Sequence, residues 1–284
     1  AFKEPKTIGK AIENIAANKI KNSEILVVAP DNETLSAAKK LANKYKNLKI
    51  LKDEGKGKPA ALNLAVSKAE GKILILTDGD VFVGENSISL LLAKFADKKV
   101  GAVSGRPIPL NSRNNRYGYW AYLLTEIANE RRKKAIKLKK RFFCSGYLFA
   151  IRKELFPALD KELLSEDGFI SHEVYKKNYK IDYSEDSKVY IKYPDNFKDW
   201  ILQKKRSAGG YNQIKKILNI EMRSFKKESF GAHKFLKLVK NLKHFIWLTE
   251  LFLARIYLWA EIYKDINFRK KNREEIWQRV ESTK

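Results

Sequence analysis

The sequence predicts an α/β protein with a mostly parallel central sheet flanked by helices and followed by a helical C-terminal extension. Helical and strand patterns alternate from Thr7 to Val83, as expected for strands joined by helical crossovers. Ile73 to Leu76 form an uninterrupted apolar run, which is typical of a strand buried on both faces. The chain has 284 residues with a hydrophobic share of 44%, enough for one large domain or a domain with an appendage.

Apolar periodicity assigns the elements of the first part of the chain. The sequence opens directly into a helix that precedes a strand, so we expect an earlier strand to be missing or truncated in front of Ala1. The predicted helices are Thr7–Asn18, Asp31–Tyr45, one beginning near Lys58, and Glu85–Phe95, and the predicted strands are Glu24–Ala29, Leu48–Leu51, Ile73–Leu76 and Val100–Gly105.

The character of the sequence changes after residue 109. We place the α/β domain in residues 1–212 and a helical, basic, amphipathic region in residues 213–284. The segments that follow are an aromatic stretch, Tyr117–Ile127; a basic run, Arg131–Arg141; a strand-like stretch around Ser145-Gly146, Phe142–Arg152; a strand, Lys188–Lys192; a helix, Asn196–Lys205; and an apolar helix, Leu242–Lys264.

The charge balance is unusual, because 58 Lys and Arg face 33 Asp and Glu and leave a net charge of +25. Such a field favours nucleic acid, anionic membrane or phosphorylated ligands. The single cysteine, Cys144, excludes an intramolecular disulfide and fits a reducing compartment. No signal peptide and no run of about 18 uncharged apolar residues is present. We therefore expect a cytoplasmic protein that associates peripherally with the inner face of the cell membrane.

Two segments could contact a membrane. Arg131–Arg141 has eight basic residues in eleven, and it could bind anionic lipid or a phosphate-bearing acceptor, contact nucleic acid, or form a solvated helix face. In Leu242–Lys264, apolar residues recur at three- and four-residue steps. That stripe predicts either core packing or an interfacial helix.

Asp78, Gly79 and Asp80 follow the predicted buried strand, at the edge where α/β sheets bind ligands. The glycine allows a tight turn, so that both carboxylates can approach one hard cation, Mg²⁺ or Mn²⁺. A divalent ion held by so few carboxylates keeps positions open for a diphosphate. The alternative is an acidic turn after a core strand.

Gly55-Lys56-Gly57-Lys58 interleaves two glycines and two lysines just before a helix. This pattern offers N–H donors and ammonium groups to an anion, and it lacks the spacing of a Walker A loop. A solvated basic turn is the alternative interpretation.

Ser165-Glu166-Asp167 permits two interpretations. Ser165 could be a helix N-cap, with the two acidic residues in the first turn favouring the helix dipole. Asp167 could instead be a general base. Farther along, Trp200, Gln203 and Arg206 stand at helical spacing.

Assembled in order, these motifs resemble those of family 2 glycosyltransferases with the GT-A fold, in the branch with cellulose, chitin and hyaluronan synthases and ceramide glucosyltransferase. The resemblance covers roughly residues 1–212. It rests on GKGKPAALN at 55–63, the DxD at 78–80, Ser165-Glu166-Asp167 as the (T/S)ED motif, Gln203-Lys204-Lys205-Arg206-Ser207 in place of QxxRW, and Ala1-Phe2-Lys3-Glu4 in place of the segment after the family's first strand.

The resemblance implies an inverting, metal-dependent transfer of a sugar from a nucleotide-sugar, a UDP-sugar. If Leu242–Lys264 is an interfacial helix, we expect the acceptor to be membrane-associated and lipid-linked. In the implied site, the metal on the donor diphosphate is held by Asp80 and Asp78, and the catalytic residue is Asp167, with Glu166. The donor is bound by Lys58, Asp31, Asp78, Gln203 and Arg206. The acceptor is contacted by Ser145 and Gly146.

Two departures limit the resemblance. Ala29-Pro30-Asp31 stands where the family has an Asp-Asp pair, so Asp31 is a substitute candidate for base recognition. Ser207 replaces the tryptophan of QxxRW, which argues against a processive polymer synthase.

Two other functions remain as alternatives. One is a transferase that acts on a soluble glycan or protein. The other is a basic nucleic-acid-binding module on a degenerate fold, but the sequence has no recognised RNA or DNA motif, so we expect no nucleic-acid partner.

Overall fold

The computed structural model describes residues 1–218, 236–267 and 280–283. The chain forms two compact units, the first made of Ala1–Ile108 with Arg131–Ile191 and the second of Pro109–Glu130 with Lys192–Thr283. The domain boundary predicted after residue 212 lies inside a continuous helix, α7 (Phe197–Leu218). Much of the predicted basic C-terminal region, residues 219–235 and 268–279, lies outside the described residues.

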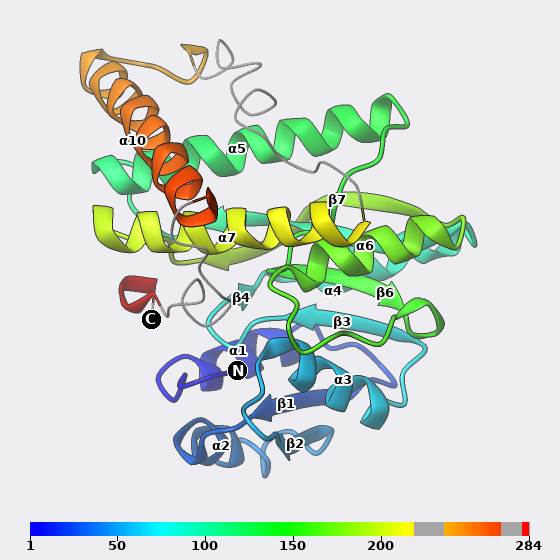
Figure 1. The fold of residues 1–284 in the computed structure, drawn as a ribbon. Coiled ribbons are helices and arrows are strands. Elements are labelled where there is room, and N and C mark those ends of the chain that lie inside the picture. Colours follow the sequence, from blue (N-terminus) through cyan, green and yellow to red (C-terminus); the bar gives the residue numbers. More distant parts are fainter. Residues whose placement is uncertain (219–235, 268–279, 284) are drawn as a thin grey trace. The chain divides into compact units, whose positions relative to one another are not determined.

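Helices and strands alternate through the first unit (Figure 1), which confirms the α/β class. Its elements are α1 (Ile8–Ala16), β1 (Ile25–Ala29), α2 (Asn32–Lys39), β2 (Leu48–Lys52), α3 (Lys58–Lys68), β3 (Ile73–Thr77), β4 (Phe82–Val83), α4 (Ser87–Ala93), the 3-10 turn η1 (Lys94–Ala96), β5 (Val100–Pro109), β6 (Leu148–Arg152), the 3-10 turn η2 (Lys153–Leu155), α6 (Glu166–Lys176) and β7 (Lys180–Ile191).

Strand directions differ from the predicted mostly parallel sheet. β1 and β2 pair in parallel, as expected. The five-stranded sheet has the order β3-β6-β5-β7-β4, and its pairs β3–β6, β5–β6 and β4–β7 are antiparallel. Hydrophobic periodicity identifies strands and helices, but it does not fix the direction in which the chain returns to the sheet.

β3 is half-buried rather than buried on both faces. Leu74 and Leu76 are buried, whereas Ile73 and Ile75 are partly exposed. Successive side chains of a strand point to opposite faces of the sheet, so one face of β3 is more fully covered than the other.

The strand predicted over Phe142–Arg152 begins only at Leu148. Before it, three successive N–H groups donate to side chains instead of to a neighbouring strand. The donors are Cys144, Ser145 and Gly146, and the acceptors are Ser171 Oγ, Ser104 Oγ and Asp167 Oδ2. This loop therefore has satisfied backbone groups without being part of the sheet.

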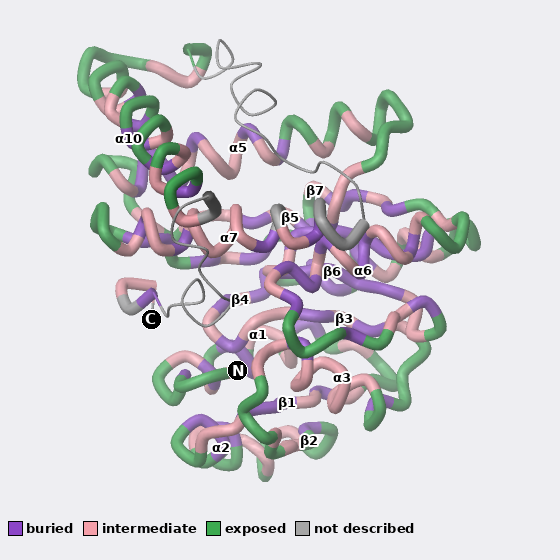
Figure 2. The backbone as a smooth tube through the Cα atoms, viewed as in Figure 1, coloured by how far each residue is buried: buried purple, intermediate pink, exposed green. Residues whose placement is uncertain are grey.

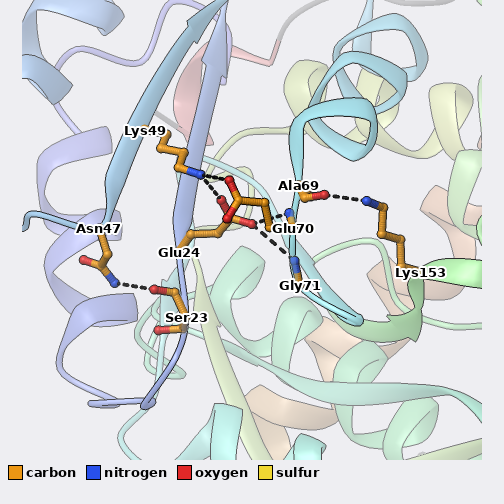
Figure 3. A network of polar contacts seen from close by, with 8 residues as sticks. All are labelled: Ser23, Glu24, Asn47, Lys49, Ala69, Glu70, Gly71 and Lys153. Carbon is orange, nitrogen blue, oxygen red and sulfur yellow. Dashed lines mark hydrogen bonds and ion pairs between the residues drawn. The ribbon is translucent and has the colours of Figure 1, made fainter.

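Polar contacts tie the amino ends of the strands together (Figure 3). Glu24, just before β1, accepts hydrogen bonds from the N–H groups of Glu70 and Gly71 in the turn before β3, at 2.6 and 3.3 Å. Lys49 of β2 pairs with Glu24 and Glu70 at 2.8 and 2.6 Å. The same turn is also bound through its Ala69 carbonyl, which accepts from the Lys153 ammonium.

The second unit is helical. It contains the first part of α5 (Arg116–Lys137), α7, α10 (Leu242–Asn267) and the 3-10 turn η3 (Glu281–Thr283) (Figure 1). Its core joins Trp120 of α5, Trp200 of α7 and Leu251 of α10. The Trp120 Nε1–H donates to the Trp247 carbonyl at 2.7 Å. Along α10, buried and exposed residues alternate (Figure 2).

Within the described ranges, the helices are all too short or too polar to cross a bilayer.

Candidate active site

The predicted carboxylates lie at the carboxyl end of β3. Asp78 directly follows Thr77, the last residue of that strand. Thr77 is in register with Leu148 of β6, and its hydroxyl donates to the Tyr147 carbonyl at 2.9 Å. The antiparallel pairing thus brings the loop before β6 beside Asp78.

Gly79 is required for close packing as well as for the turn. A Cβ atom at this position would overlap the Glu4 carboxylate and the Ala1 side chain. The segment Ala1–Glu4 is itself held near β1 and α2, because the Ala1 amino nitrogen donates to the Val28 carbonyl and the Glu4 N–H donates to Thr34 Oγ1, both at 2.8 Å. The segment that resembles the family's motif after its first strand therefore lies against the DxD turn.

Lys58 is the first residue of α3, and the backbone of the loop before it requires the two glycines of the GKGK segment. Gly55 and Gly57 have φ values of +72° and +96°, the left-handed region that favours glycine. The Lys58 ammonium lies 2.6 Å from Asp78 Oδ1 and 2.7 Å from Glu166 Oε1. Lys58 therefore bridges two carboxylates from different elements, and its contact with a donor stays a prediction.

Electrostatics favour the charged form of Lys58. Burial alone would lower the pKa of the ammonium, but the carboxylates of Asp78 and Glu166 outweigh that effect, and its pKa is raised above the usual 10.5. Glu166 is the more enclosed partner, with 12% of its side chain exposed against 30% for Asp78. The bridge is therefore a charged contact in a partly dehydrated place.

Asp167 faces the loop before β6. Its Oδ2 accepts the Gly146 N–H at 3.1 Å, while its Oδ1 accepts the Ser165 hydroxyl and the Gly168 N–H, both at 2.8 Å. A carboxylate offers roughly four acceptor sites, so these donors orient the group and leave room for an acceptor hydroxyl.

Ser165 occupies the predicted N-cap position of α6, but it does not make the hydrogen bond expected of an N-cap side chain. The hydroxyl donates to Asp167 instead, because an ionised carboxylate is a strong acceptor and lies only two residues away.

Ser145 and Gly146 contact the protein itself. The Ser145 N–H donates to Ser104 Oγ at 3.0 Å, and the Ser145 side chain is buried. A Cβ atom on Gly146 would lie 3.3 Å from Asp167 Oδ2, so a larger residue would press on that carboxylate. The Gly146 contacts position Asp167, and a direct contact of Ser145 or Gly146 with an acceptor stays a prediction.

Asp31, the candidate for base recognition, also has a structural role. Its carboxylate caps α2 by accepting the Thr34 N–H at 2.9 Å, and it accepts the Lys3 N–H at 2.8 Å. Burial raises its pKa, but these hydrogen bonds outweigh burial, and the pKa is lowered below its ordinary 3.8.

Gln203 and Arg206 lie on α7, in the second unit. Gln203 is 9% exposed, and its Oε1 has no hydrogen-bond partner among the described residues. A buried amide oxygen without a partner is costly, so this atom is well suited to accept from a ligand.

The residues present suit a divalent cation. Asp78 and Asp80 supply hard carboxylate oxygens two residues apart, and Glu166 adds a further negative charge beside the Lys58 ammonium. Within the part of the chain that the structure describes, no group of three or more His, Cys, Asp or Glu side chains forms a protein-only metal site. Mg²⁺ is commonly bound by one or two carboxylates together with phosphate and water oxygens.

Asn63, the last residue of the GKGKPAALN segment, has a contact that sequence reasoning missed. Its side-chain amide exchanges two hydrogen bonds with the backbone of Leu159, at 2.8 and 3.0 Å. The pair ties α3 to the segment that leads towards α6. Its sequence signal is a polar amide within a largely apolar helix.

The basic run Arg131–Arg141 comprises the end of α5 and the residues after it, most of them exposed. Arg132 lies over the Tyr183 ring at 5.8 Å, and Lys133 pairs with Glu185 at 3.2 Å. Parts of the run are thus held by β7, within the same unit.

Comparison with known proteins identifies the family. The sequence model described as "Glycosyl transferase family 2" matches residues 1–159, more than half of the chain. The chain belongs to glycosyl transferase family 2. The matched range includes the GKGKPAALN segment and the DxD turn, whereas Glu166, Asp167 and the residues of α7 lie beyond it.

Similar proteins include the O-antigen chain rhamnosyltransferase WbaN of Salmonella anatum, 25% identical over 180 residues that cover 59% of this chain and 56% of that protein. The probable glycosyltransferase YdaM of Bacillus subtilis is 26% identical over 205 residues, which cover 67% of this chain and 48% of that protein. The chain spans about half the length of the curated relatives it matches.

Among solved structures, the mannosyltransferase PcManGT from Pyrobaculum calidifontis, in complex with GDP-Man and Mn²⁺, superposes with a TM-score of 0.62 at 18% identity. The superposition covers 95% of this chain and 86% of that one. S. aureus TarS gives a TM-score of 0.51 at 17% identity, covering 76% of this chain and 42% of that one. These similarities confirm the GT-A fold.

Proposed function

We propose that the chain is an inverting glycosyltransferase that moves one sugar from a nucleotide-sugar to a membrane-associated, lipid-linked acceptor. One observation carries this proposal. Lys58 joins Asp78, on the donor side, to Glu166, and the next residue, Asp167, is oriented by the loop beside Asp78. Groups suited to a diphosphate and a group suited to a hydroxyl therefore meet at the carboxyl end of β3.

In the proposed reaction, Asp167 takes the proton of the acceptor hydroxyl. The acceptor oxygen attacks the anomeric carbon from the face opposite the leaving group, and the bond to the nucleoside diphosphate breaks, so the configuration inverts. Lys58 would stabilise the negative charge that develops on the diphosphate. The family resemblance gives Arg206 of α7 the same role as a prediction. Mg²⁺ or Mn²⁺, held by Asp78 and Asp80, would neutralise part of that charge when bound.

The names of similar proteins support the substrates in part. WbaN is named as an O-antigen chain rhamnosyltransferase, which favours a lipid-linked acceptor, and PcManGT is in complex with GDP-Man and Mn²⁺. The proposed donor is a UDP-sugar, and a GDP-sugar is the competing candidate. Ser207, in place of the family's tryptophan, favours transfer of single sugars over polymer synthesis.

An acceptor at a membrane also suits the charge of the chain. With a net charge of +25, the protein would be attracted to anionic lipid. We propose a location at the inner face of the cell membrane, with the Arg131–Arg141 segment among the attracted groups.

A thermal-shift panel tests the donor site. Nucleoside diphosphates and UDP- and GDP-sugars are added to the wild type and to Asp80→Ala, each with and without Mn²⁺. A ligand at about 100 times its dissociation constant stabilises the fold by about 2.7 kcal/mol. We expect a metal-dependent shift for one nucleotide that is lost in Asp80→Ala.

The matched control is Asp186→Ala, which removes an exposed aspartate of β7. It should keep the shift. A shift that persists unchanged in Asp80→Ala would refute the metal assignment, and a wild type that responds to no nucleotide would refute the donor site.

A further inference from the structure

α10 has two apolar faces. The inner face packs in the core of the second unit through residues that are 1–7% exposed: Leu248, Leu251, Ala254, Leu258 and Ile262. The outer face is formed by residues that are 49–74% exposed: Leu242, Phe245, Ile246, Leu253, Ile256 and Tyr257. The two interpretations of the apolar stripe, core packing and an interfacial helix, thus apply to different faces of one helix.

The outer face is broad. Phe245 with Ile246, and Ile256 with Tyr257, place two large side chains next to each other in single turns of the helix. The other exposed positions between Phe245 and Tyr257 are Thr249 and Phe252, which carry no charge. The charged residues of this stretch, Glu250 and Arg255, are partly buried, and Glu250 pairs with Arg116 at 3.3 Å. A wide apolar face suits a flat apolar surface better than the narrow seam that a single partner helix requires.

Cations lie at both ends of α10. Lys237, Lys240 and Lys243 are exposed just before and at the start of the helix. Lys264, near its end, is also exposed, and it lies 3.7 Å from the Glu261 carboxylate. A helix with an apolar face between lysines, with aromatic residues on that face, matches the composition of helices that lie in the interface of an anionic bilayer.

We propose that the outer face of α10 docks the protein on an anionic lipid bilayer, with the helix lying in the plane of the interface. The proposal deepens the proposed function, because it names the surface that would bring the protein to a lipid-linked acceptor. It rests on the proposed function only for the purpose of docking, since binding to a bilayer requires no sugar donor. The inner face stays packed in the second unit, so α10 inserts its outer face without leaving the fold.

A second copy of the chain is a weaker occupant. Two outer faces placed against each other would bring the lysines at the ends of one α10 close to those of the other, and like charges in contact are unfavourable. Anionic lipid head groups instead neutralise the same lysines, each of which strengthens binding to such a surface by about fivefold.

Co-sedimentation of the full chain with vesicles tests the proposal. The vesicles are phosphatidylcholine with about a third phosphatidylglycerol, compared with pure phosphatidylcholine. We expect the wild type to bind the anionic vesicles, and Leu253→Glu combined with Ile256→Glu to weaken that binding by about tenfold or more. Leu110→Glu is the matched control, because Leu110 is 51% exposed and lies outside α10.

Selective labelling adds a direct readout of contact. The chain has a single cysteine, Cys144, which is buried, and burial raises the pKa of its thiol to about 12, so it reacts slowly. An environment-sensitive fluorophore on Ile256→Cys should shift to the blue when anionic vesicles are added. The same fluorophore on Leu110→Cys should not shift.

Three results would overturn the proposal. In the first, the double Glu variant binds anionic vesicles as well as the wild type does. In the second, the label on Ile256→Cys does not respond to vesicles. In the third, the wild type is a dimer that does not bind vesicles, and the double variant is a monomer. The thermal-shift panel contains no lipid and the vesicle assays contain no nucleotide. Failure of the docking surface is therefore distinguishable from failure of the donor site.

Discussion

Two lysines of the first unit each bridge a pair of carboxylates, at opposite ends of β3. Before the strand, Lys49 lies 2.8 Å from Glu24 and 2.6 Å from Glu70. After the strand, Lys58 pairs with two carboxylates at 2.6 and 2.7 Å. The two bridges therefore have nearly the same distances.

Their surroundings differ. The Lys49 bridge is open to solvent, since 79% of the Glu70 side chain is exposed, whereas only 12% of the Glu166 side chain is exposed in the Lys58 bridge. Glu24 also accepts backbone N–H groups, which serves the fold (Figure 3). The solvent exposure of an ion pair and the other hydrogen bonds of its carboxylates therefore help to distinguish a functional site from a structural bridge. The distance between the charged atoms does not distinguish them.

The largest effect is expected next to the Lys58 bridge. Asp167→Asn should lower the transfer rate by about 100- to 10,000-fold, because an amide cannot accept the acceptor proton. Donor binding in the thermal-shift panel should be unchanged. Transfer near the wild-type rate would show that Asp167 is not the base.

Lys58→Met sharpens the comparison directly. It would leave the carboxylates of Asp78 and Glu166 without their shared cation, and their repulsion would displace the groups that orient the donor. We expect transfer to fall about 100-fold, as for a small displacement of reacting groups. The measurement is kcat and KM for the donor, with Lys49→Met as the matched control that should leave both unchanged.

Glu24→Gln tests the structural bridge through pH. The hydrogen bond from Lys49, followed by the Glu70 N–H, outweighs desolvation and lowers the pKa of Glu24 below its ordinary 4.5. A lowered pKa in the folded state contributes stability above about pH 4.5, which is lost as the pH falls through the folded-state value.

We therefore expect Glu24→Gln to lower the free energy of unfolding by about 1 kcal/mol or less at neutral pH, because solvent screens this partly open bridge. The difference from wild type should shrink in acid. Urea unfolding across that pH range measures it, and a difference that stays constant with pH would contradict the ionic origin of the effect.

The smallest effect is expected from Lys49→Met. This lysine is 44% exposed, and many exposed ion pairs contribute nothing measurable to stability. Raising the salt concentration should reduce even a small difference in urea unfolding, because solvent ions screen exposed charges. A loss of stability larger than that of Glu24→Gln would mean that exposure does not separate the two bridges.

The α/β class, the order of the motifs and the family resemblance followed from the sequence. Local patterns were sufficient for these features because glycines at Gly55 and Gly57, the apolar run of β3 and the paired aspartates after it are each encoded within a few residues. The GT-A fold predicted from them is confirmed, although the individual site roles remain predictions.

Strand direction and side-chain partners were decided by the tertiary structure. No local pattern in β6 states that it runs antiparallel to β3, yet that pairing brings Gly146 to the side of β3 where Asp78 lies. Ser165 was predicted as a cap and instead donates to Asp167. Such contacts join residues or elements by geometry that only the folded chain creates.

α10 shows the same division within one helix. Its three- and four-residue periodicity predicted an apolar stripe, but apolar residues occupy both its buried and its exposed positions. Periodicity measures how hydrophobic a face is, and it does not say which neighbour covers it. Burial against α5 and α7 in the second unit separates the face that stabilises the fold from the face available to a surface such as a membrane.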